Sequence, residues 1–387
     1  MTTSTDSTSA GPDATADDAA TVVREDLEHI CGGLSDELPR LSGKRLLIIG
    51  GAGFLGHYLV QTAVHWNATR ATGDLAPIEV VVYDNYSRGV PPWLKALEGT
   101  DHLTLKTFDI TGPLPHDIGH VDYIIHAASI ASPTYYRKHP IETMDANVNG
   151  LRTLLDYALA EKRAGRGLDG FLFYSTSEIY GDPPADQIPT PETYRGNVSC
   201  TGPRACYDES KRYGETLCVN FAEQHEIPVA VARPFNNYGP GLKVTDGRVI
   251  SDFAGDILAG RDVVMLSAGT PTRTFCYVAD AVVGYYKILV RGRAGEAYNI
   301  GTESPEISMA ELARRLVTAA GALWGYSGAV VLGQSSDADY LIDNPNRRSP
   351  IISKARDELD YDPSVALDDG LRRALIWYKA NHVAEDS

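Results

Sequence analysis

The stretch Arg45-Leu46-Leu47-Ile48-Ile49-Gly50-Gly51-Ala52-Gly53-Phe54-Leu55-Gly56 decides the fold of this chain. Its first five residues predict a short buried strand, and the glycines come next, before a helical stretch that runs to about Trp66. Gly50 permits a tight turn, Gly53 lets the backbone approach a pyrophosphate, and Gly56 allows a helix to pack closely on a strand. A glycine triad also occurs in ordinary turns, but the strand before it and the helix after it favour a dinucleotide site. The predicted contacts in this turn are Gly50, Gly53, Phe54, Leu55 and Gly56.

Short apolar runs recur downstream of this turn, with helix-length segments between most of them. They lie at 80–83, 103–107, 123–125, 171–174 and 229–232. Strands that alternate with helices in this way predict an α/β fold with a Rossmann-type, doubly wound parallel sheet that helices cover on both faces.

Asp84 closes the second strand, where a carboxylate can accept hydrogen bonds from both ribose hydroxyls of NAD and would repel the extra phosphate of NADP. Arg88 keeps NADP possible as the cofactor, because a nearby arginine can bind the 2′-phosphate of NADP. Asp109, after the third strand, is expected either at the adenine or as an ordinary turn residue. The predicted cofactor is NAD, with further contacts from Asn85, Arg88, Asp109, Ile110 and Ala127.

Composition and pattern predict four segments along the chain. Residues 1–22 are mostly Thr, Ser, Asp, Ala and Gly, so we expect a disordered tail, and residues 23–43 are expected to form an N-terminal helical segment. Residues 44–235 are predicted to form the NAD-binding Rossmann domain. Residues 236–387 are predicted to form mainly a smaller α/β substrate-binding domain, with the strand and helix at about 274–300 returning to the Rossmann domain.

Acidic residues outnumber basic ones by 51 to 35, which gives a formal net charge of −16, and no basic run interleaves with aromatic residues. This composition argues against nucleic acid or an anionic membrane surface as a partner. The five cysteines are odd in number and lack metal-ligand spacing, which predicts free thiols and no metal site. No apolar run reaches the ~20 residues that cross a bilayer, and no signal peptide is recognisable, so we expect a cytoplasmic protein.

The segment Tyr207-Asp208-Glu209-Ser210-Lys211 places a phenol and an ammonium group one helical turn apart on the same face. The lysine and the positive charge of a nicotinamide both favour phenolate. We therefore expect the pKa of Tyr207 to fall until the phenol can take a proton from a sugar hydroxyl. The segment lies downstream of a predicted strand that ends in Ser175-Thr176-Ser177-Glu178. Tyr207 and Lys211 are the predicted acid–base pair beside the cofactor.

These segments, together with His126-Ala127-Ala128 and Arg233-Pro234-Phe235-Asn236, resemble the extended short-chain dehydrogenase/reductases over about residues 44–380. Within that superfamily the chain resembles the UDP-glucuronic acid decarboxylases. The motifs that carry this second resemblance are Ala131-Ser132-Pro133, Ser175 to Pro183, Gly202 to Glu209, Asp246 to Ile250 and Arg348-Ser349-Pro350. The chain departs from the family at Ser349, where a lysine is usual, and at Asn237-Tyr238, where Thr-Phe is usual.

The resemblance implies that carbon 4 of UDP-glucuronate is oxidised, that the resulting β-keto acid loses CO₂, and that return of the hydride gives UDP-xylose. Ser177 stands where the related 4,6-dehydratases carry an aspartate. A hydroxyl there can donate to a substrate carboxylate that an aspartate would repel. The implied catalytic residues are Thr176, Ser177, Glu178, Tyr207, Lys211 and Arg348. The implied contacts to the UDP-sugar substrate are Ser132, Pro133, Asn236, Arg248, Val249, Arg273 and Arg348.

Several alternatives stay open at this point. Arg348 is implied to hold the substrate carboxylate, but the adjacent Arg347 leaves the register ambiguous, and Arg348 could also be a surface residue. Release of the 4-keto pentose, with NADH left behind, is another outcome of the same chemistry. A 4,6-dehydratase or 4-epimerase would share most of these motifs, and an inactive NAD-binding regulator would share the fold. The resemblance also implies a homodimer, built as a four-helix bundle from the helix after Pro140 and the helix that carries Tyr207.

Overall fold

The computed structural model describes residues 18–334, 342 and 344–382, and its centre is a sheet built around β1 (Arg45–Ile49). Seven strands pair in parallel in the order β11-β6-β5-β4-β1-β2-β3. The strand order reverses between β1 and β4, so the carboxyl ends of these two strands open the crevice in which doubly wound folds bind ligands. The predicted α/β fold is confirmed. The other strands are β2 (Glu79–Asp84), β3 (Leu103–Thr107), β4 (Tyr123–His126), β5 (Gly170–Tyr174), β6 (Val229–Pro234) and β11 (Ala297–Ile300).

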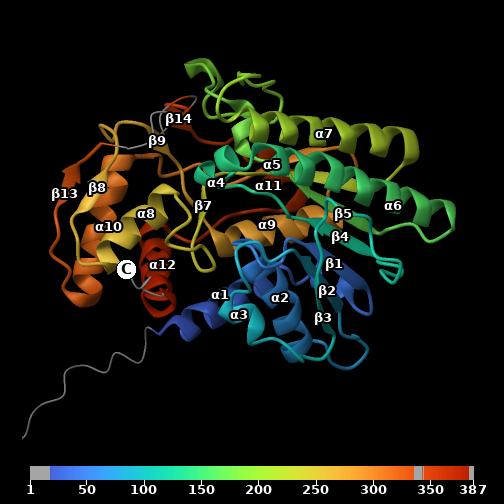
Figure 1. Ribbon diagram of the computed structural model, residues 1–387. Helices are drawn as coiled ribbons and strands as arrows, with labels where there is room; N and C mark the ends of the chain where they lie inside the picture. The colour runs from blue at the N-terminus through green and yellow to red at the C-terminus, as the bar shows by residue number, and fades with distance from the viewer. Residues whose placement is uncertain (1–17, 335–341, 343, 383–387) are drawn as a thin grey trace, which may run out of the picture.

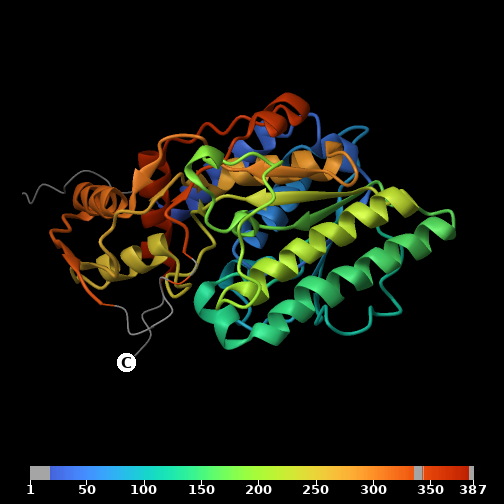
Figure 2. The ribbon, with the colours of Figure 1, turned by 90° about the horizontal axis from the view of Figure 1, so that it is seen from above.

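Helices cover both faces of this sheet (Figure 1). Because side chains alternate along a strand, Leu46 and Ile48 point into one core while Leu47 and Ile49 point into the other. The first core is closed by α2 (Gly56–Thr69) and α9 (Val278–Arg291), and the second by α6 (Leu151–Arg163) and α7 (Ala205–His225). α6 and α7 run side by side (Figure 2). Shorter helices are α3 (Pro92–Lys95), α4 (Pro133–Lys138) and α5 (Pro140–Asp145).

A smaller lobe lies at one end of the sheet (Figure 1). It contains a three-stranded sheet in the order β12-β9-β14, in which β9 is antiparallel to β12 and parallel to β14. Within the described part of the chain, no helix is both long and apolar enough to cross a membrane. The elements of the second half are β7 (Asn237–Tyr238), α8 (Val249–Leu258), β8 (Val263–Met265), β9 (Thr272–Arg273), β10 (Cys276–Tyr277), β12 (Ile307–Ser308), α10 (Met309–Trp324), β13 (Val330–Leu332), β14 (Arg347–Arg348), α11 (Ser353–Leu359) and α12 (Leu367–Asn381).

The segment predicted to return to the Rossmann domain divides in two. α9 packs against β5 and β6, and β11 pairs with β6, so both belong with the main sheet. The strand before them, β10, instead pairs with β7 in a separate two-stranded ladder. The expectation that this strand joins the main sheet is therefore wrong, because β11 takes the place beside β6.

The N-terminal helix α1 (Ala19–Gly33) begins earlier than the sequence indicated. Residues 19–22 belong to this helix, so the predicted tail ends too late; the rest of that tail, residues 1–17, lies outside the described residues. Asp26 anchors the helix: its carboxylate accepts hydrogen bonds at 2.5 Å from the phenols of Tyr58 and Tyr277 and pairs with Arg373 at 3.0 Å. These partners come from α2, β10 and α12, so α1 joins the two lobes.

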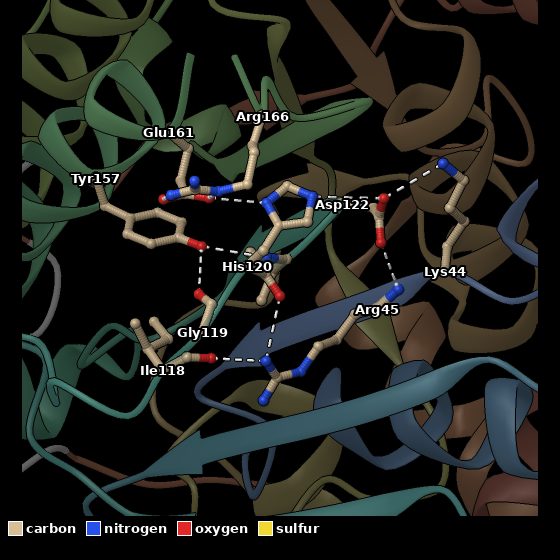
Figure 3. A network of polar contacts seen from close by, with 10 residues as sticks. Lys44, Arg45, Ile118, Gly119, His120, Asp122, Tyr157, Glu161 and Arg166 are labelled. Carbon is tan, nitrogen blue, oxygen red and sulfur yellow. Dashed lines mark hydrogen bonds and ion pairs between the residues drawn. The ribbon is translucent and has the colours of Figure 1, made fainter. Parts of the chain in front are cut away.

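A network of polar contacts fixes the amino ends of β1 and β4 (Figure 3). Asp122 accepts a hydrogen bond from the Arg45 backbone N–H at 2.8 Å and pairs with Lys44 Nζ at 3.3 Å. The Arg45 guanidinium donates to the His120 carbonyl at 3.2 Å, and the His120 ring contacts Glu161 of α6 at 2.9 Å. The network lies at the edge opposite the carboxyl ends of the strands, so it fixes the strands without entering the crevice.

Candidate active site

The glycine-rich turn joins β1 to α2 at the carboxyl edge of the sheet. Gly50 has φ +86°, and a Cβ there would lie 2.5 Å from the backbone N of Ala128, so only glycine fits. A Cβ at Gly56 would lie 2.1 Å from the carbonyl oxygen of Gly51, which requires glycine where α2 begins. At Gly53 the nearest atom to a Cβ would be the Gly50 oxygen at 3.3 Å, so the backbone there stays open to a ligand.

Asp84 ends β2 and ties the glycine turn to the following loop. Its Oδ2 accepts a hydrogen bond from the Ala52 N–H at 2.9 Å, and its Oδ1 accepts one from the Tyr86 N–H at 2.8 Å. Burial raises the pKa of the carboxyl, and the two backbone donors oppose this effect. A carboxylate held against the glycine turn in this way fits the ribose of NAD.

The other predicted cofactor residues lie in the loops after β2, β3 and β4. Asn85 Nδ2 donates to Asp109 Oδ2 at 3.2 Å, and Asp109 Oδ1 accepts from the Thr111 N–H at 2.9 Å. Asp109 therefore has the contacts of a turn aspartate, one of its two predicted roles, and these contacts leave its prediction as a cofactor residue untested. Ile110 is buried, and Ala127 directly follows β4.

Arg88, the residue that kept NADP possible as the cofactor, has another partner in this structure. Its Nη1 lies 2.7 Å from Asp246 Oδ2 in the smaller lobe, and its guanidinium lies 4.7 Å from the ring centroid of Tyr135. The glycine turn and Asp84 thus fit NAD without an arginine committed to a 2′-phosphate. When bound, this cofactor supplies a hydride acceptor.

Tyr207 and Lys211 lie on the buried face of α7, as their spacing predicts. Burial raises the pKa of Tyr207 to about 12, and a hydrogen bond with Thr176 opposes this only in part. The predicted fall in this pKa is wrong for the protein alone, because desolvation outweighs the groups that favour phenolate. Lys211 Nζ donates to the Tyr174 carbonyl at 2.7 Å and lies 5.8 Å from the Tyr207 ring centroid. Burial lowers the pKa of Lys211 to about 7, so its charge changes near neutral pH.

α4 brings a second aromatic ring against Tyr207. Tyr136 is buried, and its ring stacks on that of Tyr207 with centroids 5.1 Å apart and planes within 7°. Ser132, the residue before α4, donates to the Asp246 carbonyl at 2.5 Å, and Pro133 begins the helix. The sequence indicated Ser132 and Pro133 but missed Tyr136, because nothing in the local pattern places its ring against α7.

Two arginines converge on the carboxylate of Glu178, which lies just after β5 in the short helical turn Ser177–Tyr180. Arg348 of β14 forms a fork, with Nη1 on Oε1 and Nη2 on Oε2, the second at 2.8 Å. Arg204, just before α7, also donates to Oε2. Burial alone would raise the pKa of Glu178, but the two guanidinium groups outweigh it and hold this pKa well below its usual range. The site therefore contains a buried, ionised carboxylate between two cations.

The structure resolves one sequence ambiguity and adds a residue that was missed. Arg347 is 43% exposed and pairs with Glu306 at 2.7 Å, whereas the side chain of Arg348 is 10% exposed and faces Glu178. Arg204 is 7% exposed and was not assigned a role. Its only signal was its place in the Gly-Pro-Arg motif before Tyr207, because chain order does not show that it meets a carboxylate 26 residues earlier.

Arg273 pairs with Arg348 in the β9–β14 register and is almost fully buried. Its guanidinium donates to the carbonyls of Pro345 at 2.5 Å and Asn346 at 3.2 Å, just before β14. Burial, with the charge of Arg348 nearby, lowers the pKa of Arg273 to about 9. In this structure Arg273 therefore supports the strand that carries Arg348, and its predicted contact with a diphosphate stays a prediction.

The other predicted substrate residues lie where β6 leads into the smaller lobe. Arg248 precedes α8, is 31% exposed, pairs with Asp246 at 3.0 Å and lies 5.7 Å from the Phe54 ring centroid in the glycine turn. Val249 begins α8 and is half-buried. Asn236 adopts φ +44° and donates to the Thr274 carbonyl at 2.8 Å. Of these three, Arg248 presents a partly exposed cation beside the cofactor turn.

Metal ligands are not gathered at this site. Across the ranges 18–334 and 344–382, with residue 342, no group of three or more His, Cys, Asp or Glu side chains could hold a metal ion. All five cysteines lie in these ranges, and each is a free thiol.

Comparison with known proteins identifies relatives that cover most of this chain. Residues 46–301 match the NAD dependent epimerase/dehydratase family. UDP-glucuronic acid decarboxylase 3 of Arabidopsis thaliana is 39% identical over 327 residues, which cover 84% of this chain and 86% of that protein. UDP-glucuronic acid decarboxylase 1 of Xenopus tropicalis is 36% identical over 340 residues, which cover 87% of this chain and 72% of that protein.

Two solved structures share this architecture. The dTDP-glucose 4,6-dehydratase of Streptomyces venezuelae, solved with NAD bound, superposes with a TM-score of 0.73 at 27% identity and covers 87% of this chain and 97% of its own. The UDP-glucose 4-epimerase of Thermotoga maritima superposes with a TM-score of 0.72 at 23% identity and covers 87% of this chain and 99% of its own. At this identity the likeness shows a shared fold. The matched range 46–301 contains the glycine turn, Asp84, Tyr207 and Lys211. The chain belongs to the NAD dependent epimerase/dehydratase family, and NAD is its cofactor.

Proposed function

We propose that this protein is a NAD-dependent UDP-glucuronate decarboxylase. The observation that carries the proposal is the pair of arginines, Arg204 and Arg348, that converges on one carboxylate beside Tyr207. A guanidinium fork is the usual partner of a carboxylate, and a buried one requires an anion to satisfy it. Glu178 is that anion in the ligand-free protein, and the carboxylate of a uronic acid has the same chemistry.

The residue before Glu178 favours an acidic sugar over a neutral one. Ser177 is buried at the end of β5, and a hydroxyl there can donate to a carboxylate oxygen. An aspartate at this place would protonate a departing hydroxyl but would repel a substrate that carries its own carboxylate. The relatives named UDP-glucuronic acid decarboxylases, at 36–39% identity, support the same choice.

The chemistry begins at the hydroxyl on carbon 4 of the sugar. Tyr207 takes the proton from this hydroxyl while a hydride leaves carbon 4. The hydrogen bond with Thr176 opposes the burial that raises the pKa of the phenol, and the positive charge of bound NAD⁺ would oppose it further. The product is a ketone β to the carboxylate. CO₂ can then leave, because the electron pair of the broken bond is delocalised onto the ketone oxygen, where Tyr207 and Thr176 donate hydrogen bonds.

Glu178 has a second task when the sugar carboxylate takes the fork of Arg348. Its pKa is low only because Arg204 and Arg348 contact it, and burial would otherwise raise this pKa. When the sugar carboxylate takes the place of Glu178 on Arg348, the pKa of Glu178 rises and the carboxylate can take up a proton from solvent, which it then delivers to carbon 5 after CO₂ has left. Return of the hydride to carbon 4 completes the formation of UDP-xylose.

The proposal is tested by incubating the purified protein with NAD⁺ and UDP-glucuronate labelled with ¹³C at carbon 6. We expect the label to appear in CO₂ and an unlabelled UDP-pentose to accumulate, with the reduced and 4-keto forms distinguished by mass spectrometry. Turnover of dTDP-glucose with no turnover of UDP-glucuronate would replace this proposal with the dehydratase function of the Streptomyces venezuelae relative. Binding of NAD⁺ without turnover of either sugar nucleotide would support the alternative of an inactive NAD-binding regulator.

We also propose that the protein is a homodimer through α5 and α7. Three large apolar side chains are exposed on these neighbouring helices: Ile141 at 59%, Met144 at 36% and Tyr213 at 51%. Side chains of this kind on adjacent helices suit a helical interface.

A further inference from the structure

The loop at 243–248 in the smaller lobe makes contacts with the nucleotide-binding lobe that the proposed chemistry does not use. Asp246 is buried, and each of its carboxylate oxygens faces an arginine. Arg88 Nη1 lies 2.7 Å from Oδ2, and Arg248 Nε lies 3.0 Å from Oδ1. One carboxylate thus bridges an arginine of the nucleotide-binding lobe and an arginine of the smaller lobe.

Two further hydrogen bonds hold this loop in place. Lys243 Nζ donates to the Arg88 carbonyl at 2.6 Å, and Ser132 Oγ donates to the Asp246 carbonyl at 2.5 Å. Ser132 precedes α4, whose Tyr135 ring lies under the guanidinium of Arg88 at 4.7 Å. The loop is therefore tied both to the loop after β2 and to the start of α4.

The two arginines lie at the two loops that flank the NAD site. Arg88 follows Asp84 in the loop after β2, and Arg248 lies over the ring of Phe54 in the glycine turn. Arg248 is also the partly exposed cation that is predicted to contact the diphosphate of the sugar nucleotide. Asp246 consequently connects a residue of the cofactor side to a residue of the substrate side.

We propose that Arg88 and Asp246 form a latch between the lobes that retains NAD and couples its binding to that of a nucleoside diphosphate through Arg248. The identity of the second ligand rests on the proposed function, whereas the latch rests on the contacts alone. A restrained Arg248 loses less side-chain freedom when a diphosphate binds, and a diphosphate that holds Arg248 keeps Asp246 on Arg88. By thermodynamic linkage, each ligand must then tighten the binding of the other by the same factor.

The test compares Arg88→Met with Arg70→Met. Arg88 is 40% exposed, so removal of its guanidinium is expected to leave the fold intact. Arg70 is 42% exposed and pairs with Glu28 of α1 rather than with a residue of the latch, which makes it a matched control. The rate of NADH release is measured by fluorescence after mixing with excess NAD⁺, with and without saturating UDP or dTDP. Melting temperatures of the three proteins show whether either substitution disturbs the fold.

In the wild-type protein and in Arg70→Met we expect a nucleoside diphosphate to slow NADH release. In Arg88→Met we expect release to become roughly fivefold to tenfold faster, which is the combined scale of one ion pair and one cation–π contact, and the effect of UDP to shrink toward none. Arg88→Lys should recover part of both effects. The proposal is overturned if Arg88→Met releases NADH at the wild-type rate, or if neither UDP nor dTDP changes release in the wild-type protein. Turnover of UDP-glucuronate tests the proposed function separately.

Discussion

The substitution Glu178→Gln separates two explanations of the arginine pair. If Arg204 and Arg348 serve the sugar carboxylate, then Glu178 competes with the substrate for the fork of Arg348. Glutamine keeps the size of glutamate but carries no charge, so it removes the competitor and leaves the Arg348 fork without its anion, whereas Arg204 keeps Asp208 at 4.0 Å. We therefore expect the variant to bind UDP-glucuronate more tightly than the wild-type protein does, although it loses the proton carrier.

The size of this effect follows from the contacts that are exchanged. In the wild-type protein the substrate carboxylate takes the place of the Glu178 carboxylate on Arg348. One fork is exchanged for another, so the exchange contributes little net free energy of binding. In the variant the same carboxylate gains at least one charge-assisted hydrogen bond without displacing another, which contributes about 1.5–3 kcal/mol. This corresponds to roughly 10- to 150-fold tighter binding.

The assay is calorimetric titration of both proteins with UDP-glucuronate and with UDP-glucose. Both carry Tyr207→Phe in addition, so that no turnover occurs during the titration. UDP-glucose differs from UDP-glucuronate at carbon 6, where it has no carboxylate, and its affinity should not increase in the variant. An equal change for the two ligands, or weaker binding of UDP-glucuronate alone, would show that the arginine pair does not receive the sugar carboxylate.

Four further outcomes are expected. Tyr207→Phe alone should lower hydride transfer by roughly 10²- to 10⁴-fold because it removes the proton acceptor, measured as the loss of transient NADH absorbance. Arg348→Ala should keep its affinity for the cofactor, but its rate of decarboxylation should fall roughly 100-fold or more. Arg347→Ala, which changes an outward-facing side chain, should keep the wild-type rate. Equal turnover by both variants would mean that the wrong arginine is assigned. Burial, with Asp246 and Asp256 nearby, raises the pKa of Asp252 to about 7. The stability that this proton provides is present below the ordinary carboxyl pKa and is lost as pH rises through about 7. Asp252→Asn should therefore raise the melting temperature by ~1–3 °C at pH ~8, and the gain should shrink toward pH ~5. Ile141→Asp should convert a dimer into a monomer in light scattering, and a wild-type protein of monomer mass would refute the α5–α7 interface.

Local patterns were sufficient for the parts of the site that one segment builds. The glycine turn could be recognised from its place between a predicted strand and a predicted helix, although the contact that requires glycine at position 50 comes from the distant Ala128. The spacing of Tyr207 and Lys211 fixes their shared face of α7. Patterns of this kind depend on helical or strand periodicity, which the sequence shows directly.

Contacts between distant segments were not visible in the same way. Arg88 meets Asp246 158 residues further along the chain, and Arg348 meets Glu178 across 170 residues. The predicted fall in the pKa of Tyr207 does not occur in the protein without its cofactor for a related reason: the lysine is four residues away in sequence, but the burial that dominates comes from the whole fold. The direction of that pKa shift depends on which charged groups remain near a desolvated phenol, and this is a property of the tertiary structure.

Under the proposed function, the arginine pair would explain how a chain with a net charge of −16 can select an anionic substrate. Over distances longer than about 10 Å, salt screens the overall negative charge, whereas buried guanidinium groups act at contact distance. Arg204 and Arg348 could not remain buried and unpaired, because an unpaired buried charge costs several kcal/mol. Glu178 stabilises them in this structure, and under the proposed function the carboxylate of the sugar replaces it on Arg348. A neutral sugar would leave Glu178 ionised on the fork of Arg348. Such a sugar would gain no contact with the fork, and Glu178 could not carry a proton to carbon 5. If the proposed function holds, the same exchange that admits the acid therefore prepares the residue that its decarboxylation requires.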